Sequence, residues 1–273
     1  MKPMKKVALL HSMCSVGKAS LTNMIPILST MGIEACAIPT VLLSTHTGGY
    51  GIPATYRVEA EYIRSCAEHY KQNKILFDII FVGYLGSIDM VSSVQYFLDC
   101  FPDASVVLDP ILGDHGSYYR NLGPEYVNAF KQLISYADVL LPNLTEACLL
   151  TDTAYRTDLK KETMEDVCKK LQCMGAKQVI VTSVPATCTQ VGLALLNSES
   201  MQFFSFSKEQ DEFHGSGDVF DAVFLGSLLK GSPTETCIKN AHDFVCACIR
   251  ESVKYDYPKR EGLLVEKTLS LLV

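Results

Sequence analysis

Length, composition and charge narrow the function classes before any motif is considered. The chain has 273 residues, of which 48% are hydrophobic and 20% charged, which is ordinary usage for a globular protein that can bury one large core. Its formal net charge of −6 offers no basic surface for a phosphate backbone, so nucleic acid is not an expected partner.

The cysteines and the apolar runs bear on the compartment. Eleven cysteines are scattered from Cys14 to Cys248 without a C-x-x-C pair, so neither a disulfide framework nor a zinc site is expected. The thiols indicate a reduced, cytoplasmic protein. The apolar run Val7 to Leu10 is too short for a signal peptide, and no stretch reaches spanning length, so no membrane partner is expected.

Short β-rich runs without polar alternation recur along the chain, as expected for strands buried on both faces. They cover residues 6–10, 34–43, 77–83, 104–109, 138–142 and 178–183. Helical spacing marks residues 21–31 and 162–174 between them, as in amphipathic helices. Further on, the sequence predicts an edge hairpin from residues 191–197 and 201–207, then helices over 217–230, 234–253 and 259–272. This order predicts an α/β fold with a mostly parallel sheet covered on both faces, in a single domain spanning residues 1–273.

The segment SVGKAS, residues 15–20, is similar to a phosphate-binding P-loop but fails the pattern. The P-loop needs a glycine at the position of Ser12 and a serine or threonine at the position of Ala19. We therefore interpret this segment as a turn into the first helix.

The segment HGSGD, residues 214–218, precedes a long apolar run. Two glycines at a helix start let successive backbone N–H groups face one small volume, where the helix dipole also favours phosphate oxygens. Asp218 lies in the first turn, within reach of a hydroxyl that attacks a phosphorus atom held there. A glycine turn with an acid that merely favours the helix start is the alternative.

Polar residues follow two further strands. Asp109 ends the run VVLD and precedes a loop with Gly113, Asp114 and Gly116, and the carboxyl ends of parallel strands are where ligands bind. Asn143 and Glu146 follow the next strand and have the spacing of a helix capping box. Glu146 is also a candidate to hold Mg²⁺ through water, because Mg²⁺ keeps several waters and takes few carboxylates directly.

Three other segments offer hydroxyl groups or a glycine loop. Thr182 and Ser183 end a later strand, where they can meet phosphate. Ser12 ends the first strand, the glycine-rich loop 44–51 follows the second, and Tyr84 follows the third. Together these three features of the N-terminal side can line a pocket for a small, flat, polar substrate.

In this order the motifs resemble those of the ribokinase-like superfamily, and more narrowly the pyridoxal and pyridoxamine kinases. The resemblance rests on STHTGGYG, GYLGS, LDPILGDHGSYY, LLPNLTEACLL, VIVTSV and HGSGDVF, and it covers nearly the whole chain. It implies a three-layer α/β/α fold, a homodimer, and ATP-dependent phosphorylation of the hydroxymethyl group of pyridoxal, pyridoxamine or pyridoxine. ATP and Mg²⁺ are the implied cofactors, and a monovalent cation is a further candidate.

The same likeness implies roles for individual residues. Asp218 matches the base that acts on the hydroxymethyl group, and Gly215, Ser216 and Gly217 match the anion hole around the phosphoryl group. The positions that match substrate contacts are Ser12, Thr47 and Tyr84. The positions that match nucleotide contacts are Asp109, Asn143, Thr182 and Ser183, while Glu146 and Asp109 match water-mediated Mg²⁺ contacts.

Two alternatives stay open. A related branch of the superfamily phosphorylates hydroxymethylpyrimidine, and sugar or nucleoside kinases share the G-x-G-D motif. A protein of another class, one that binds or senses vitamers without turnover, is the second alternative. The presence of Asp218 with both glycines favours an enzyme, since a binding protein has no need of a base.

Overall fold

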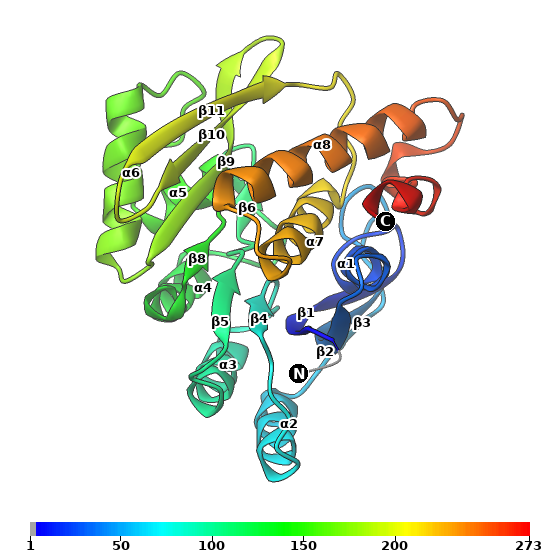
Figure 1. The fold of residues 1–273 in the computed structure, drawn as a ribbon, viewed down its shortest axis with the longest axis vertical. Coiled ribbons are helices and arrows are strands. Elements are labelled where there is room, and N and C mark those ends of the chain that lie inside the picture. Colours follow the sequence, from blue (N-terminus) through cyan, green and yellow to red (C-terminus); the bar gives the residue numbers. More distant parts are fainter. Residues whose placement is uncertain (1–3) are drawn as a thin grey trace. The chain divides into compact units, whose positions relative to one another are not determined.

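Figure 1 shows the computed structural model of the chain, which describes residues 4–273. The chain forms two compact units, and each is described by itself. The first unit contains the described part of residues 1–58 together with residues 76–78 and 209–273; the second contains residues 59–75 and 79–208. The single domain expected from the sequence stays a prediction.

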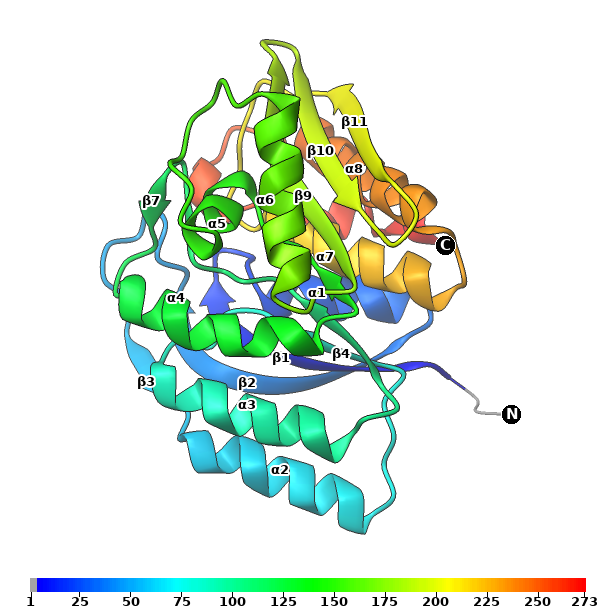
Figure 2. The same cartoon turned by 90° about the vertical axis from the view of Figure 1, so that its left-hand side faces the viewer.

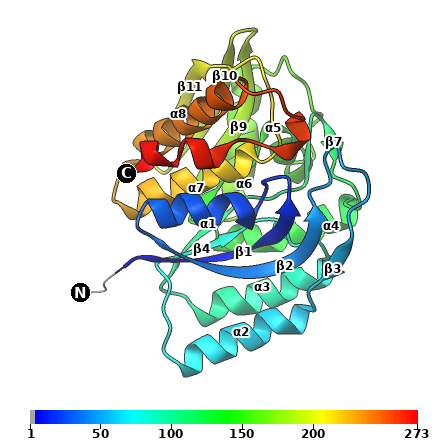
Figure 3. The ribbon, with the colours of Figure 1, turned by 90° about the vertical axis from the view of Figure 1, so that its right-hand side faces the viewer.

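The first unit is built on two long parallel strands. β1 (Lys6–Val16) pairs with β2 (Glu34–Thr45), and the short β3 (Thr55–Arg57) adds antiparallel to β2. Residues 7–10 of β1 are fully buried, which explains why this run has no polar alternation. α1 (Leu21–Thr30) connects the two long strands, α7 (Ser216–Leu229) packs on α1, and α8 (Thr234–Ser252) packs on α7, as Figure 3 shows.

The second unit holds a sheet with strand order β11-β10-β9-β8-β5-β4. Its parallel strands are β4 (Ile79–Val82), β5 (Ser105–Leu108), β8 (Val139–Leu140) and β9 (Gln178–Thr187). The predicted edge hairpin is confirmed, because β10 (Gln190–Leu196) and β11 (Met201–Ser207) pair antiparallel in full register. A separate two-stranded hairpin consists of β6 (Gly113–Asp114) and β7 (Ser117–Tyr118).

The helices of the second unit pack in sequence order. They are α2 (Ala60–Gln72), α3 (Ile88–Cys100), α4 (Pro124–Phe130), the 3₁₀ helix η1 (Lys131–Tyr136), α5 (Leu144–Leu150) and α6 (Lys161–Cys173). Figure 2 shows α2, α3 and α4 side by side and α6 along β9 and β10. Across residues 4–273, no helix has both the length and the apolar character needed to cross a membrane.

The helix predicted over residues 259–272 is wrong. In its place lie three short 3₁₀ turns, η2 (Lys259–Glu261), η3 (Val265–Lys267) and η4 (Leu269–Leu272). Gly262 has a φ of 79°, a left-handed conformation that interrupts a helix. Leu263 and Val265 are buried beside it, so tertiary burial at irregular spacing replaces the helical face that the apolar residues suggested.

Candidate active site

The N-terminus of α7 has the geometry of an anion site. Gly215 caps the helix with a φ of 80°, and a Cβ placed there would lie 2.2 Å from the Lys18 carbonyl oxygen, so only glycine fits. The N–H groups of residues 216–218 have no acceptor within the helix and stand at its positive end. A Cβ on Gly217 would meet no atom within 4 Å. The open space at Gly217, together with these amides, therefore suits the oxygens of a phosphoryl group.

Asp218 is held in place at the start of the same helix. The residue is 9% exposed, and its Oδ2 accepts a hydrogen bond of 2.7 Å from the backbone N–H of Ser20. Its Oδ1 lies 2.9 Å from Nε2 of His11. An ionised carboxylate has about four acceptor positions on its two oxygens, so two such bonds leave Asp218 the capacity to accept a hydroxyl proton.

The strained segment between β1 and α1 supports Asp218. Positive φ angles occur at Gly17, Lys18 and Ser20, a combination that costs energy for residues other than glycine. The amide of Asn23 donates to the carbonyl oxygens of Lys18, at 2.6 Å, and of Gly215, at 3.2 Å. This segment is a turn into α1, as predicted. Its strained conformation directs the N–H group of Ser20 at Asp218.

Ser12 does not end a strand, which corrects the sequence interpretation. β1 continues to Val16, and its register with β2 shifts between His11 and Met13, as at a β-bulge. The bulge changes the direction of the Ser12 side chain, whose Oγ lies 2.8 Å from Oγ of Ser20. Ser12 is 3% exposed, so the structure brings it to the segment that holds Asp218.

Thr47 lies in the exposed glycine-rich segment that follows β2. The neighbouring His46 is buried and anchors this segment. Its Nδ1 accepts from the N–H of Gly48 at 3.0 Å, and its Nε2 donates to the carbonyl oxygen of Arg260 at 2.6 Å. Tyr84 belongs to the second unit, in the segment after β4. A shared substrate pocket of Ser12, Thr47 and Tyr84 stays a prediction.

The second unit gathers the predicted nucleotide residues from three strands. Asp109 directly follows β5, and its N–H donates to the carbonyl oxygen of Val82. The capping box of α5 is confirmed: Asn143 Oδ1 accepts from the N–H of Glu146, and Glu146 Oε2 accepts from the N–H of Asn143. The amide of Asn143 also donates to the carbonyl oxygen of Gly113 at 2.9 Å, which fixes the β6–β7 hairpin beside α5.

The strand with Thr182 and Ser183 runs further than predicted. β9 continues to Thr187, but Ser183 has a φ of 55°, and this bend ends the parallel part of the strand. The last parallel contact is a bridge between Asn143 and Thr182, while the other edge of β9 pairs antiparallel with β10 from Val179 to Thr187. Thr182 is thus adjacent to the capping box, and the exposed Ser183 is the residue at the bend.

The buried Glu146 lies close enough to the half-buried Asp109 for the two carboxylates to interact electrostatically. Glu146 is 2% exposed, and its Oε1 accepts from the N–H of Leu112 at 3.0 Å. Burial, followed by the negative charge of Asp109, raises the pKa of Glu146 well above its ordinary value. Residues 4–273 contain no cluster of three or more histidine, cysteine or acidic side chains that could enclose a metal ion.

This arrangement fits Mg²⁺ held through water better than Mg²⁺ held directly. Both oxygens of Glu146 already accept backbone N–H groups, so its carboxylate has little room for an inner-sphere bond. The half-buried Asp109 stands beside it, and Mg²⁺ commonly takes one or two carboxylates and keeps its other ligands as water and phosphate. A cation here would also relieve the repulsion between the two acids.

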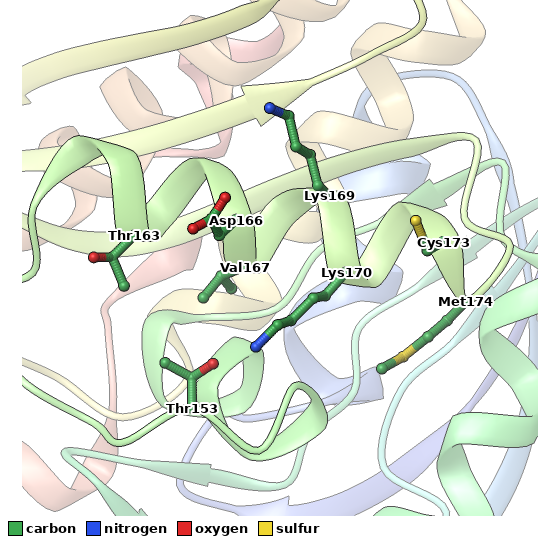
Figure 4. Close-up of a pocket in the computed structure, with 8 residues that line it drawn as sticks. All are labelled: Thr153, Thr163, Asp166, Val167, Lys169, Lys170, Cys173 and Met174. Carbon is green, nitrogen blue, oxygen red and sulfur yellow. The ribbon is translucent and has the colours of Figure 1, made fainter.

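A cavity of the second unit contains none of the predicted site residues. It has a volume of about 590 Å³ and lies along α6, where Lys170 points toward Thr153 and Lys169 points away, as Figure 4 shows. Its charged side chains are exposed, and Lys169 pairs with Glu165. The cavity is a surface groove with no buried polar group directed into it.

One residue of this site was missed by the sequence analysis. His11 is fully buried and contacts Asp218, yet the two residues lie 207 positions apart. A lone histidine in an apolar strand contains no signal for that partner.

Comparisons with known proteins identify the family of this chain. The family model described as phosphomethylpyrimidine kinase matches residues 24–261. A hydroxymethylpyrimidine/phosphomethylpyrimidine kinase of Haemophilus influenzae is 32% identical, over 62% of this chain and 63% of the relative, so the chain spans less than two thirds of that relative.

Solved structures match over nearly the whole chain. A Bacteroides thetaiotaomicron protein assigned to the phosphomethylpyrimidine kinases, crystallised with pyridoxal, is 34% identical with a TM-score of 0.92, covering 98% of this chain and 96% of that one. The pyridoxal kinase of Lactobacillus plantarum is 30% identical with a TM-score of 0.90 and the same coverage. The ribokinase-like α/β fold class predicted from the sequence is confirmed. The chain belongs to the phosphomethylpyrimidine kinase family.

Proposed function

We propose that this chain is an ATP-dependent kinase that phosphorylates the hydroxymethyl group of pyridoxal, pyridoxamine or pyridoxine. The observation on which the proposal depends is the start of α7. There Asp218 lies in the first turn, whose N–H groups have no acceptor within the helix, and open space adjoins Gly217. The relative from Bacteroides thetaiotaomicron was crystallised with pyridoxal, which supports a B6 vitamer as the alcohol.

The chemistry is phosphoryl transfer by positioning and charge stabilisation. The amides of residues 216–218 hold the oxygens of the migrating phosphoryl group. Asp218 accepts the hydroxyl proton: the substrate O–H bond breaks, a bond from that oxygen to phosphorus forms, and the bond from phosphorus to the oxygen of ADP breaks. Asp218 then carries the proton until the product leaves.

ATP and Mg²⁺ belong to this proposal. Mg²⁺ neutralises charge on the triphosphate. Asp109 and Glu146 can bind the Mg²⁺ ion through water molecules. Asn143, Thr182 and Ser183 are the proposed phosphate contacts, because they adjoin that pair at the end of the parallel strands. A requirement for a monovalent cation is tested by comparing turnover in potassium salts with turnover in tetramethylammonium salts.

A substrate screen tests the function. ADP release is measured with MgATP and each of pyridoxal, pyridoxamine, pyridoxine, hydroxymethylpyrimidine and a sugar. The proposal requires the largest kcat/KM with a B6 vitamer. Hydroxymethylpyrimidine is the second candidate, favoured by the family model and by the Haemophilus influenzae relative, and a preference for it would reassign the substrate. Binding of every vitamer without ADP release would indicate a binding or sensing protein.

Asp218→Asn tests the proposed base. Turnover should fall by about 10²- to 10⁴-fold, the usual contribution of a positioned base, while ATP affinity changes little. The amide nitrogen of asparagine would face one of two hydrogen-bond donors, so thermal unfolding must be measured alongside. Asp103→Asn, at an exposed turn, is the matched control. Full activity of Asp218→Asn would refute the mechanism.

A homodimer is part of the proposal. On the first unit, exposed apolar side chains gather on β1, β2, β3 and the segment before β3: Met13, Val16, Leu42, Ile52 and Tyr56. Burial of such a patch against a second copy removes apolar surface from water. Light scattering should give twice the chain mass, and Leu42→Lys with Tyr56→Asp should give a monomer. A monomeric wild type would contradict this.

The thiols support the proposal of a reducing, cytoplasmic compartment. All eleven cysteines lie within residues 4–273 and are free thiols. Seven are buried, which is typical of cysteines that serve as small apolar residues.

A further inference from the structure

Asp218 is bonded to a histidine whose protonation can be assigned. The backbone N–H of Ser12 donates to Nδ1 of His11 at 2.8 Å, so Nδ1 is an acceptor and carries no proton. In a neutral imidazole the proton then resides on Nε2. Nε2 therefore donates to Oδ1 of Asp218, at 2.9 Å.

We propose that His11 is a positioning residue for the base: it donates from Nε2 to Asp218 and thereby fixes the plane of the carboxylate for the incoming hydroxyl. This inference rests on the proposed function, in which Asp218 accepts the substrate proton. Neither the motifs nor the family comparison assigns a role to His11.

The two bonds to Asp218 act on different oxygens. His11 binds Oδ1 and the Ser20 N–H binds Oδ2, so rotation of the carboxylate about its last torsion angle breaks at least one bond. His11 is 0% exposed, and a buried donor meets no competition from water. Hydrogen bonds to an ionised acceptor are also shorter and stronger than neutral ones. The remaining acceptor positions of Asp218 are thus held in one orientation.

The arrangement reverses the order of a serine protease triad. There the imidazole faces the nucleophile and the acid orients the imidazole. Here the acid faces the proposed substrate and the imidazole orients the acid. Because Nε2 already bears a proton, His11 cannot take a second one there, and the substrate proton stays on Asp218.

The neighbouring thiol does not disturb this pair. Burial, followed by the charge of Asp218, raises the pKa of Cys14 to about 12, so Cys14 is a neutral thiol at physiological pH. The Asp218 carboxylate therefore depends on His11 and the Ser20 N–H for its orientation.

Two substitutions at His11 separate the donor from the rest of the ring. In His11→Gln the amide nitrogen can take the place of Nε2 and still donate to Asp218. In His11→Asn the shorter amide reaches only the position of Nδ1 and cannot donate to Asp218. We expect His11→Asn to lower kcat by about 10²-fold, as a base displaced by about 1 Å would, with KM values for ATP and the alcohol nearly unchanged. His11→Gln should recover most of this loss.

The control removes a histidine elsewhere. His69→Gln, on the exposed side of α2, should keep the wild-type kcat. Equal kcat in His11→Asn, His11→Gln and the wild type would overturn the inference, and so would an equal loss in both His11 variants with their folds intact.

A second measurement does not depend on activity or on the folding of a variant. Long-range ¹H–¹⁵N correlation spectra of the wild type report the tautomer of each imidazole. A His11 ring with a proton on Nε2 and none on Nδ1 supports the inference, whereas a proton on Nδ1 overturns it. If the wild type phosphorylates no alcohol in the screen, the proposed function fails, and this spectrum alone decides whether His11 donates to Asp218.

Discussion

The two glycines of the α7 N-terminus should respond in opposite ways to the same substitution. At Gly215 the φ of 80° is unfavourable for alanine, and the new methyl group would lie 2.2 Å from the Lys18 carbonyl oxygen. At Gly217 the φ is ordinary and a methyl group would meet no atom within 4 Å. Gly215→Ala is therefore expected to damage the fold, and Gly217→Ala to damage only the reaction.

The magnitudes follow from these contacts. For Gly215→Ala the left-handed backbone costs about 1–2 kcal/mol, and the forced shift of a packed segment costs about 1–3 kcal/mol, giving a loss of roughly 2–5 kcal/mol. Gly217→Ala should raise the free energy of unfolding by about 0.4–1 kcal/mol, because alanine restricts the unfolded chain. Its methyl group would occupy the space in front of the amides and displace the phosphoryl group, at a cost of about 10²-fold in kcat.

Urea unfolding and steady-state ADP release on the same preparations measure both effects. Gly217→Ala should be at least as stable as the wild type yet much slower, with little change in ATP affinity. A fully active Gly217→Ala would show that the space at Gly217 does not receive the phosphoryl group. A Gly215→Ala variant as stable as the wild type would refute the packing argument.

Two further predictions concern buried groups of this chain. Since the pKa of Glu146 is raised above its ordinary 4.5 by burial and by Asp109, the folded chain keeps a proton that the unfolded chain releases above that value. The free energy of unfolding should therefore fall as pH rises from about 4.5 toward the pKa of Glu146 in the folded chain, by at most about 1.4 kcal/mol per pH unit. Urea titrations at several pH values should show this fall in the wild type and not in Glu146→Gln. Identical pH profiles of the two proteins would contradict the prediction. Burial raises the pKa of Cys168 to about 12 and of Cys237 to about 11, whereas Cys173 and Cys188 are exposed. Alkylation by iodoacetamide at pH 8, followed by mass spectrometry, should modify the exposed pair first, and early labelling of Cys168 would show that α6 opens readily.

The parts of the site that local sequence determines were predicted correctly. The capping box needs only Asn143 and Glu146 three positions apart, and the structure forms it. Helix α7 was likewise predicted within one residue at each end, because the glycines and Asp218 mark its start by local chemistry. The edge hairpin follows from two β-rich runs joined by a short polar turn.

The parts that failed depend on distant contacts. The support of Asp218 by His11 and Ser20 joins residues about two hundred positions apart, and no spacing rule encodes such a pair. The residue pattern predicted that strands end at Ser12 and at Ser183, but one strand continues past a bulge at Ser12 and the other past a bend at Ser183. The C-terminal residues 259–272 had helical composition, but their burial against the rest of the first unit decided their conformation.

The C-terminal segment has a consequence for how the surroundings of Asp218 form during biosynthesis. Gly262 abuts the carbonyl oxygens of Gly17 and Lys18, and Glu266 forms an ion pair with Lys18. Gly262 and Glu266, which are synthesised near the end of translation, therefore stabilise the turn that directs the Ser20 amide at Asp218. A nascent chain that stops before residue 262 lacks this stabilisation, and contacts between such distant segments form slowly. Chains that end before residue 262 should thus be inactive even when the second unit has folded.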